Sequence, residues 1–295
     1  MIARKFLVIV NPTAGKGKHL DKLEQIKSEF IQRSVSYDLY FTSESRKADL
    51  LTNSIIKDKD YTDLMIVGGD GTINEAINGI RDKHPAVSVI SFGTGNDTIK
   101  HIQSKFDFNS QVETAFNGNV EQIDVGECNG RLFLNGVGIG FDGKVVERMA
   151  AKGKKFQGYF SYLAEVLRIL LTYREREISA TFNDNTIKEE VLLMTVAKGT
   201  TFGGGFNINP YALNDDGLLD ICIVGKVPNW TRINYVLKMK DGGHRKLKAV
   251  SFYKSRKVTI EENPALVAHM DGESIGCPPF NVVVLPKAIN FRILR

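Results

Sequence analysis

Three short loops in the N-terminal third of the chain combine glycine with small polar side chains. The first occupies residues 11–17, the second is Gly68-Gly69-Asp70-Gly71-Thr72, and the third is Gly93-Thr94-Gly95-Asn96-Asp97. Glycine lets backbone N–H groups approach phosphate oxygens, because no Cβ atom stands in the way. A helix that begins directly after such a loop adds favourable partial positive charge at its N-terminus. This composition therefore indicates the binding of a phosphate group.

Each loop also has a purely structural explanation. A tight turn from a strand into a helix needs glycine whether or not a ligand binds. Within the second loop, Thr72 is a suitable helix N-cap, and Glu75 would complete a capping box with it. The loop lacks the GxxxxGKS/T sequence of a P-loop, and no GxGxxG follows the first predicted strand. One loop alone therefore leaves the choice between a turn and a phosphate site open.

The elements that position these loops alternate between strand and helix patterns. Apolar runs and apolar spacing predict strands at 6–10, 35–41, 64–67 and 87–92 and helices within 20–30, 50–56 and 73–80. Such alternation predicts a three-layer α/β domain, in which helices cover both faces of a parallel sheet. Ligands bind at the carboxyl ends of the strands in these sheets. All three loops fall at that edge, which favours a nucleotide phosphate site over three unrelated turns.

The pattern changes after residue 125 to short strands that are separated by turn sequences such as Asn129-Gly130 and Asp184-Asn185. Strands are predicted at 122–125, 132–135, 178–182, 191–197, 219–224, 258–261, 266–270 and 282–285. Two helical patterns, over 159–171 and 230–239, interrupt them. This arrangement predicts a mostly antiparallel β-sandwich or open barrel. We therefore expect an α/β domain at 1–125, which 287–295 could rejoin, and a β-rich domain at 126–286.

The composition is that of an ordinary globular protein. The chain has 295 residues, of which 42% are hydrophobic and 25% charged, so it is neither disordered nor collagen-like. The net charge of +5 is too small to indicate nucleic-acid binding, but it is compatible with acidic ligands or an anionic membrane surface. No segment approaches the roughly 18–20 apolar residues that a membrane span needs. The three cysteines form no CxxC pair, which favours a reducing, cytoplasmic compartment.

Taken together, the motifs resemble those of the diacylglycerol kinase catalytic family, which comprises bacterial lipid kinases and is related to sphingosine kinases. In the first half the resemblance is carried by Asn11-Pro12-x-x-Gly15, by the second loop extended to Asn74-Glu75, and by the third loop. In the second half it is carried by Asp124 in Ile-Asp-Val-Gly, Asn-Gly-Val-Gly-Ile-Gly-Phe-Asp at 135–142, Asp215-Asp216-Gly217 and Met270-Asp271-Gly272-Glu273. The motifs span residues 11–273 in the order of the family.

The resemblance implies an ATP-dependent lipid kinase that transfers the γ-phosphoryl group of ATP to a hydroxyl of diacylglycerol or a similar lipid. It implies an ATP site on the α/β domain, a lipid site on the β-rich domain and a cleft between them. The residues that it implies for ATP binding are Asn11, Pro12, Thr13, Ala14, Gly15, Thr42, Gly69, Asp70, Gly71, Thr72, Ile73, Asn74, Glu75, Thr94, Asn96 and Asp97.

The resemblance also implies a structural Mg²⁺ and a general base. The metal would be bound by the Asp216 side chain and by the carbonyl oxygens of Leu213 and Leu218, a donor set that suits a hard cation. Asp271 would be the general base, with Glu273 nearby. Asp-Gly is also a common hairpin turn, so a structural role for this residue stays open.

Asp70 is a third candidate catalytic residue. Asp70 and Asp97 could hold the Mg²⁺ of the nucleotide directly or through water, or they could simply cap their loops. Most of the catalysis in a kinase of this kind would come from positioning and from neutralisation of charge on the γ-phosphoryl group.

Two other functions share part of this pattern. A soluble-substrate kinase of the NAD kinase type also has a Gly-Gly-Asp-Gly-Thr loop, and a non-catalytic nucleotide- or lipid-binding module could retain the same fold. The Asn74-Glu75 pair, the third loop and Met270-Asp271-Gly272-Glu273 look like the lipid kinases instead.

Much of the positive charge lies in basic clusters at 144–155, 238–248 and 254–257. These clusters are either a solvated face or a docking surface for an anionic membrane. For a lipid kinase we expect a substrate at the membrane surface, peripheral membrane association and no nucleic acid partner, while a homodimer stays open.

Overall fold

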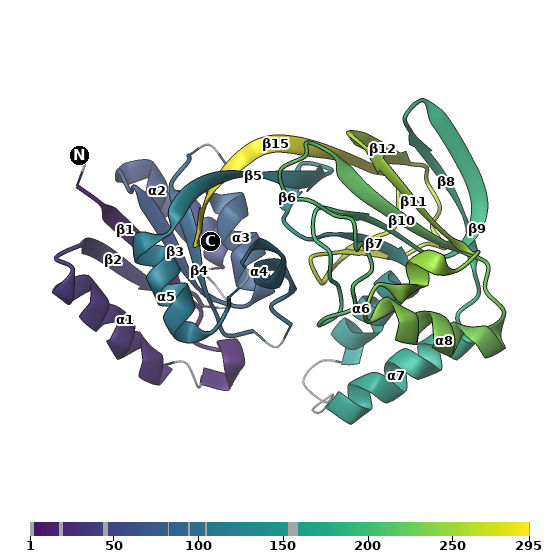
Figure 1. Cartoon of the computed structure of the whole chain (residues 1–295), viewed down its shortest axis with the longest axis horizontal. Coiled ribbons are helices and arrows are strands. Elements are labelled where there is room, and N and C mark those ends of the chain that lie inside the picture. The colour runs from purple at the N-terminus through teal and green to yellow at the C-terminus, as the bar shows by residue number, and fades with distance from the viewer. Residues whose placement is uncertain are drawn as a thin grey trace. The chain divides into compact units, whose positions relative to one another are not determined.

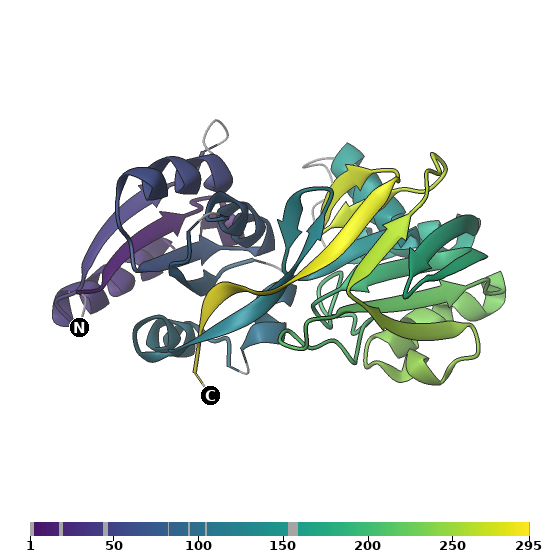
Figure 2. The same ribbon diagram turned by 90° about the horizontal axis from the view of Figure 1, so that it is seen from above.

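The computed structural model describes residues 3–17, 20–43, 47–81, 83–93, 95–103, 105–152 and 159–294 (Figure 1). The chain divides into two compact units. The first unit comprises Met1–Asp124 and Lys287–Arg295, and the second unit comprises Val125–Pro286. Two long strands, β5 (Asn119–Cys128) and β15 (Phe280–Ile293), carry the chain from one unit to the other and back (Figure 2).

The first unit is built around a parallel sheet with the strand order β2-β1-β3-β4. These strands are β1 (Lys5–Val10), β2 (Ser36–Phe41), β3 (Asp63–Gly68) and β4 (Ala86–Ser91). Its helices are η1 (Ala14–Gly17), α1 (Leu20–Gln32), α2 (Ala48–Asp58), α3 (Asp70–Gly79), α4 (Asp97–Ile102) and α5 (Phe108–Asn117). The predicted α/β domain with parallel strands is confirmed.

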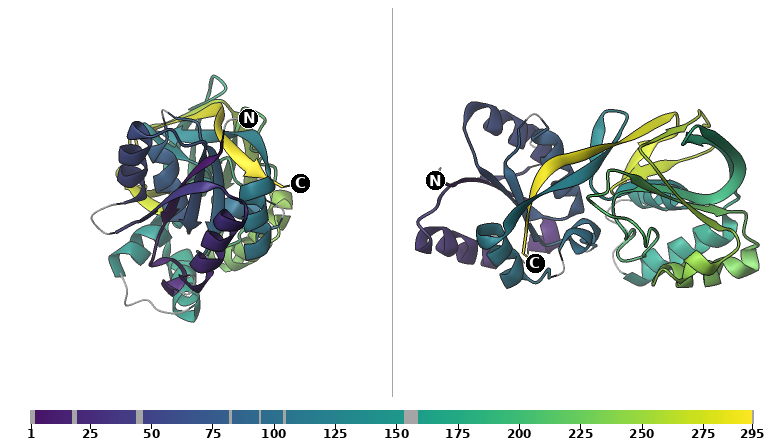
Figure 3. Two further views of the ribbon diagram at one scale, coloured as in Figure 1. Left: turned by 90° about the vertical axis from the view of Figure 1, so that its left-hand side faces the viewer. Right: turned by 45° about the horizontal axis from the view of Figure 1, so that its top comes forward.

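Helices cover both faces of this sheet. Phe6, Val8 and Val10 of β1 share a hydrophobic core with α1 and α5. The alternate residues Leu7 and Ile9 are also fully buried. Because successive side chains of a strand point to opposite faces, burial of both sets requires a second layer. Helices α2 and α3 supply it on the other side of the sheet (Figure 3).

The second unit is antiparallel. Its further strands are β6 (Arg131–Phe133), β7 (Gly136–Gly140), β8 (Arg176–Phe182), β9 (Asn185–Ala197), β10 (Leu219–Gly225), β11 (Val250–Ser255), β12 (Lys257–Ile260), β13 (Ala268–Met270) and β14 (Glu273–Gly276). Its helices are α6 (Phe141–Lys152), α7 (Tyr159–Thr172), α8 (Asn229–Met239) and η3 (Gly243–Lys246). The predicted mostly antiparallel β-sandwich is confirmed.

Strand β10 shows how the two hydrophobic cores of this unit are separated. Leu219, Ile221 and Ile223 belong to the core inside the β-sandwich, together with residues of β7, β8, β9 and β12. Cys222 and Val224 point to the opposite face, where they pack in a core with α7 and α8. The two-residue period of the strand therefore sorts its apolar side chains between the sandwich and the helical layer.

Several elements lie outside the predicted ones, namely α4, α5, β7, α6, β11 and β14. The strand predicted at 132–135 is shorter, because β6 ends at Phe133. The strand predicted at 266–270 begins only at Ala268. Among the described residues, no helix is both long and apolar enough to cross a membrane.

A buried carboxylate holds the first unit together. Asp63, at the start of β3, is fully buried, and its Oδ1 lies 2.8 Å from Arg4 Nη2 and 2.6 Å from Arg292 Nε. Arg4 precedes β1 and Arg292 belongs to β15, so one side chain joins the two ends of the chain. Removal of one partner from a buried ion pair leaves an uncompensated charge and strongly destabilises a protein.

Replacement of Asp63 by alanine is therefore expected to lower the free energy of unfolding by about 3–5 kcal/mol. The measurement is urea denaturation followed by circular dichroism. Asp60→Ala, which removes an exposed carboxylate three residues earlier, is the matched control and should change little. Equal losses of unfolding free energy in both variants would show that the buried ion pair of Asp63 with the two arginines does not stabilise the protein.

Candidate active site

The second loop leads from β3 into α3, and the helix begins earlier than the sequence indicates. Gly69 is the N-cap, in extended conformation and without a side-chain cap, and α3 begins at Asp70. Thr72 therefore lies in the first turn, and the prediction that it is the N-cap is wrong. Glu75 forms no capping box with it, because Glu75 Oε2 accepts a hydrogen bond from the Ala48 N–H at 3.0 Å. Glu75 thus joins α3 to the start of α2.

Asn11 ties the first loop to the second. Its Nδ2 donates to Thr72 Oγ1 at 2.9 Å. Its Oδ1 accepts hydrogen bonds from both the N–H and the hydroxyl of Thr13, at 3.0 and 2.9 Å. Thr42 follows β2 and lies beside this loop, since its N–H donates to the Val10 carbonyl at 2.9 Å. A side chain in the first loop therefore fixes the hydroxyl in the second.

Glycine brings the third loop against the other two. Gly15 has a φ of +55°, and a Cβ atom there would lie 2.8 Å from the Phe92 carbonyl oxygen. A Cβ atom on Gly93 would lie 2.9 Å from Gly69 Cα and 2.6 Å from Asn96 Oδ1. Each of these approaches excludes a side chain. The loops that follow β1, β3 and β4 are therefore in contact within the first unit, as the sequence predicted from their positions.

The two acidic residues of these loops stand at the starts of neighbouring helices. Asp70 Oδ1 accepts a hydrogen bond from the Thr98 N–H at 3.1 Å, so Asp70 caps α4. Asp97 is the first residue of α4 and is buried. Asn96, directly before it, has a φ of +51°. Thr94 lies outside the described residues.

The remaining implied ATP-binding residues divide between loop and core. Pro12 and Ala14 lie in the turn and the 3-10 helix after β1, and Gly71 is in the first turn of α3. Ile73 and Asn74 are buried in α3. The side chains of these two residues therefore contribute to the packing of the first unit.

Asp271 lies in the tight turn between β13 and β14. Its carboxylate accepts hydrogen bonds from the consecutive N–H groups of Leu134, Asn135 and Gly136 at 3.0, 3.0 and 2.8 Å. Both Asp271 and Gly272 have positive φ, 47° and 85°, as an Asp-Gly hairpin turn requires. Asp271 thus belongs to a hairpin turn, and three N–H donors also hold its carboxylate in one orientation.

Glu273, the other acidic residue of this motif, forms an ion pair on the surface. Its Oε2 lies 2.5 Å from Arg131 Nη2. The two side chains are 41% and 38% exposed. An ion pair in this setting contributes little to stability, so it serves to orient Glu273 at the start of β14.

Half-buried Asp142 and buried His269 form a pair beside the Asp271 turn, which the sequence patterns did not reveal. Asp142 Oδ2 lies 3.4 Å from His269 Nε2, and the Gly272 N–H donates to His269 Nδ1 at 3.3 Å. A Cβ atom on Gly138 would overlap Asp142 Oδ2. Glycine at every second position of β7 is the signal that indicates such a pair, because it leaves one face of the strand without side chains.

The loop at 213–218, which is implied to bind a structural Mg²⁺, instead contacts the ammonium groups of two lysines from other parts of the chain. Lys198 Nζ lies 3.0 Å from Asp216 Oδ1 and 2.6 Å from the Leu218 carbonyl oxygen. Lys254 Nζ lies 2.7 Å from Asp216 Oδ2. Among the described residues, no group of three or more His, Cys, Asp or Glu could hold a metal ion. Two implied ligands already contact an ammonium group, so the residues at 213–218 do not fit a divalent cation.

The lysines also set the ionisation of this cluster. Partial burial acts to raise the pKa of Asp216, but hydrogen bonds from Lys254 and Lys198 outweigh it and hold that pKa below its ordinary value of 3.8. Burial raises the pKa of Asp220, although Lys254 opposes the shift. Because the folded-state pKa of Asp216 is depressed, its contribution to stability is present at neutral pH and is lost only as the pH falls through that value.

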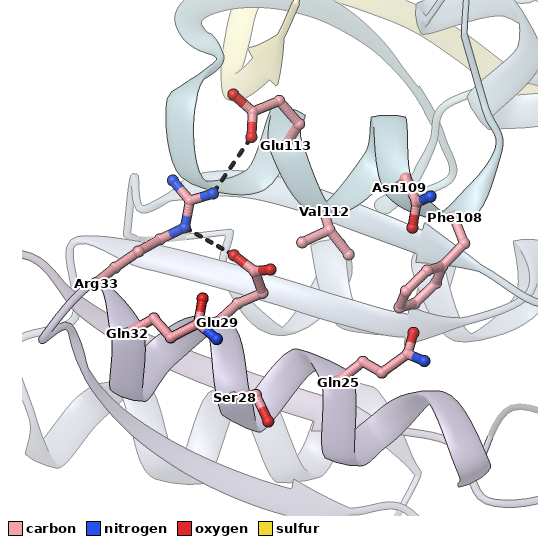
Figure 4. Close-up of a pocket in the computed structure, with 9 residues that line it drawn as sticks. All are labelled: Gln25, Ser28, Glu29, Gln32, Arg33, Phe108, Asn109, Val112 and Glu113. Atoms are coloured by element: carbon pink, nitrogen blue, oxygen red, sulfur yellow. Dashed lines mark hydrogen bonds and ion pairs between the residues drawn. The ribbon is translucent and has the colours of Figure 1, made fainter.

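A surface hollow of about 430 Å³ lies between α1 and α5 of the first unit (Figure 4). Arg33 bridges it, with Nε 2.9 Å from Glu29 Oε2 and Nη2 3.3 Å from Glu113 Oε2. Phe108 and Val112 form its apolar side. None of the described residues implied for ATP binding lines it, so it is separate from the three glycine loops.

The chain matches two family models. Residues 5–128 match the diacylglycerol kinase catalytic domain, and residues 135–293 match the YegS C-terminal NAD kinase beta sandwich-like domain. The chain belongs to the diacylglycerol kinase family that combines these two domains. Its class is therefore that of a lipid kinase, a phosphotransferase, and the resemblance seen in the motifs is confirmed.

Individual relatives match over nearly the whole chain. A diacylglycerol kinase of Staphylococcus carnosus is 27% identical over 285 residues, which cover 96% of this chain and 92% of the relative. A diacylglycerol kinase of Bacillus subtilis is 26% identical over 286 residues, with coverages of 96% and 94%. The crystal structure of a diacylglycerol kinase from Bacillus anthracis has a TM-score of 0.76 at 22% identity, covers 99% and 97% of the two chains, and supports the fold.

Proposed function

We propose that the protein transfers the γ-phosphoryl group of ATP to the hydroxyl of diacylglycerol or a similar lipid. The observation that carries this proposal is the contact of the three glycine loops at the carboxyl edge of the first sheet. Gly15, Gly69 and Gly93 leave no room for side chains where the loops meet. Backbone N–H groups and the N-terminus of α3 are thereby available at one place, which is the arrangement that binds polyphosphates.

Within the first unit, the proposed task of the loops is to hold the nucleotide phosphates in one orientation. Asn11 and Thr72 support each other through their hydrogen bond, so the first two loops hold one geometry. Asp70 and Asp97 would supply carboxylate oxygens for the Mg²⁺ that accompanies the nucleotide, and that ion would neutralise charge on the phosphoryl group. Fixed positioning of this kind accounts for much of the rate in phosphoryl transfer.

Within the second unit, the proposed task of Asp271 is to accept the proton of the lipid hydroxyl. A lipid hydroxyl is a weak nucleophile, and a positioned carboxylate near it acts as general base. Three N–H donors from the β6–β7 segment hold the Asp271 carboxylate in one orientation. The Asp142–His269 pair supports the same turn through the Gly272 N–H.

The experiment that tests this function is the transfer of label from γ-labelled ATP to dioleoylglycerol in mixed micelles. Thin-layer chromatography separates the phosphorylated lipid from ATP. We expect a labelled lipid phosphate in an amount that grows with time and enzyme. Tight ATP binding without transfer to any lipid of a panel would instead favour a non-catalytic nucleotide-binding module.

A second candidate function is that of a soluble-substrate kinase. It is favoured by the description of the C-terminal family model, which is NAD kinase beta sandwich-like. The Gly-Gly-Asp-Gly-Thr sequence of the second loop is compatible with it. Incubation with ATP and NAD, followed by an enzymatic assay for NADP, measures this activity directly.

For a lipid substrate we also propose contact with an anionic membrane. A hollow of about 300 Å³ in the second unit is lined by Lys144, Arg148, Arg174 and Arg176 together with apolar side chains. The remaining basic residues support the proposal less. Lys254 is engaged with Asp216 and Asp220, and residues 153–155 of the 144–155 cluster lie outside the described residues.

Replacement of Lys144, Arg148 and Arg174 together by glutamine is expected to weaken binding to phosphatidylglycerol vesicles by about 10²-fold at low salt. Each cation near an anionic surface contributes about 1 kcal/mol, and the contribution is screened as salt rises. Co-sedimentation with the vesicles measures the binding.

The control for this variant replaces three exposed lysines of the first unit, Lys57, Lys83 and Lys105, by glutamine. The control should keep its vesicle binding, and both variants should keep their affinity for ATP. Equal losses in the two variants, or binding that does not respond to salt, would leave these cations as a solvated face only.

A further inference from the structure

Lys198 is a lysine whose whole side chain is buried. It follows β9 directly, and its side chain is 1% exposed. The N–H groups of Lys198 and Gly199 both donate to the Asn135 carbonyl, at 2.8 and 2.9 Å, so the backbone is fixed as well. A buried ammonium group requires charged or hydrogen-bonding partners, because burial without them is very costly. Its partners are Asp216 and the Leu218 carbonyl.

The register of the sheet places a second lysine at the same carboxylate. Lys254 on β11 lies directly opposite Asp220 on β10. Its Nζ is 3.0 Å from Asp220 Oδ1 and 2.7 Å from Asp216 Oδ2. Each carboxylate oxygen of Asp216 therefore contacts a different ammonium group. The Leu218 N–H adds a further hydrogen bond to Asp216 Oδ1 at 3.1 Å.

In this arrangement, ammonium groups occupy the position next to the implied metal ligands Asp216 and Leu218. Two lysines and two aspartates make the cluster electrically balanced, and a third cation would be repelled by both ammonium groups. Mg²⁺ also requires oxygens at about 2.0–2.1 Å in an octahedron, whereas Lys198 already lies against two of the three implied ligands. The ammonium groups hold the segment 213–218 against β9 and β11.

We propose that the ammonium groups of Lys198 and Lys254 replace the structural Mg²⁺ in this chain, so that the segment 213–218 is held without a divalent cation. In the proposed function, the Mg²⁺ that accompanies a nucleotide would instead be held by Asp70 and Asp97 in the first unit. The proposal therefore does not depend on which acceptor the enzyme phosphorylates, and it can be tested on nucleotide-free protein.

The first test measures metal binding by the unaltered protein without nucleotide. Thermal unfolding is compared in EDTA and in millimolar MgCl2, and Mg²⁺ binding is measured by isothermal titration calorimetry. A site with a Kd 100-fold below the metal concentration would raise Tm by about 5 °C or more. We expect no such shift and no stoichiometric heat. A rise in Tm that Asp216→Asn abolishes would overturn the proposal.

The second test removes the buried charge but keeps an unbranched apolar side chain of nearly the same length. Lys198→Met is expected to lower Tm by about 6 °C or more, because Asp216 Oδ1 and the Leu218 carbonyl oxygen lose the buried ammonium group that they contact. Lys226→Met is the matched control, since Lys226 is an exposed lysine that pairs with Glu190 at 2.6 Å. Equal Tm values for the two variants would contradict the role of Lys198.

Discussion

Replacement of Asp271 by asparagine is expected to lower kcat for lipid phosphorylation by about 10³-fold, the effect of removing a general base. The KM for ATP should change little, because the phosphate loops belong to the first unit. The measurement is steady-state transfer of label to dioleoylglycerol. Asp184→Asn is the matched control, since Asp184 is an exposed aspartate that also has positive φ in a hairpin turn. It should keep full activity.

The structural role of Asp271 must be separated from the catalytic one. An asparagine side chain keeps one oxygen and turns an NH2 group toward the Leu134 N–H, which then loses its acceptor. The loss of a buried hydrogen bond of this kind costs about 1–3 kcal/mol. Thermal unfolding of the variant shows whether it is folded at the assay temperature. A folded Asp271→Asn variant with undiminished kcat would remove Asp271 from the role of base.

Replacement of Gly93 by alanine is expected to lower kcat/KM for ATP by about 10²-fold. The new Cβ atom would lie 2.9 Å from Gly69 Cα, so the second and third loops must move apart. A displacement of a fraction of an ångström to an ångström at groups that position a reactant has effects of about this size. The measurement is the dependence of initial rate on ATP concentration at saturating lipid.

A matched glycine gives the control for this variant. Gly225 has no neighbour closer than 3.8 Å to an added Cβ atom, so Gly225→Ala should be silent. Thermal unfolding of both variants reports any general loss of stability. If Gly93→Ala binds and uses ATP as well as the unaltered protein does, the contact between the loops is unrelated to nucleotide binding.

Strands β1, β3 and β4 of the first unit could be predicted closely because they are buried on both faces. A continuous apolar run as short as that of β1 is typical of a fully buried strand. The segments between these runs have apolar residues at helical spacing, which predicts the helices. The start of α3 could not be predicted as well. Thr72 looks like an N-cap in the sequence, but its hydroxyl bonds with Asn11, which lies far away along the chain. Local capping rules cannot include such a partner.

The cation at the segment 213–218 shows a different limit. The Asp-Asp-Gly motif is present in the sequence, and its resemblance to the family implies a metal site there. Lys198 and Lys254 look like ordinary lysines there, and only the pairing of β9, β10 and β11 brings them to Asp216. A motif therefore predicts which oxygens gather at a site. The identity of the cation depends on residues that the motif does not contain.

The most direct measurement of the central claim offers the enzyme both acceptors in one mixture, dioleoylglycerol in mixed micelles and NAD, with γ-labelled ATP. The products are separated by organic extraction and identified by mass spectrometry. We predict that the label enters the organic phase as the phosphate ester of the lipid, that NADP stays at background, and that Asp271→Asn abolishes the transfer. Label in NADP with none in the lipid would contradict the proposed function.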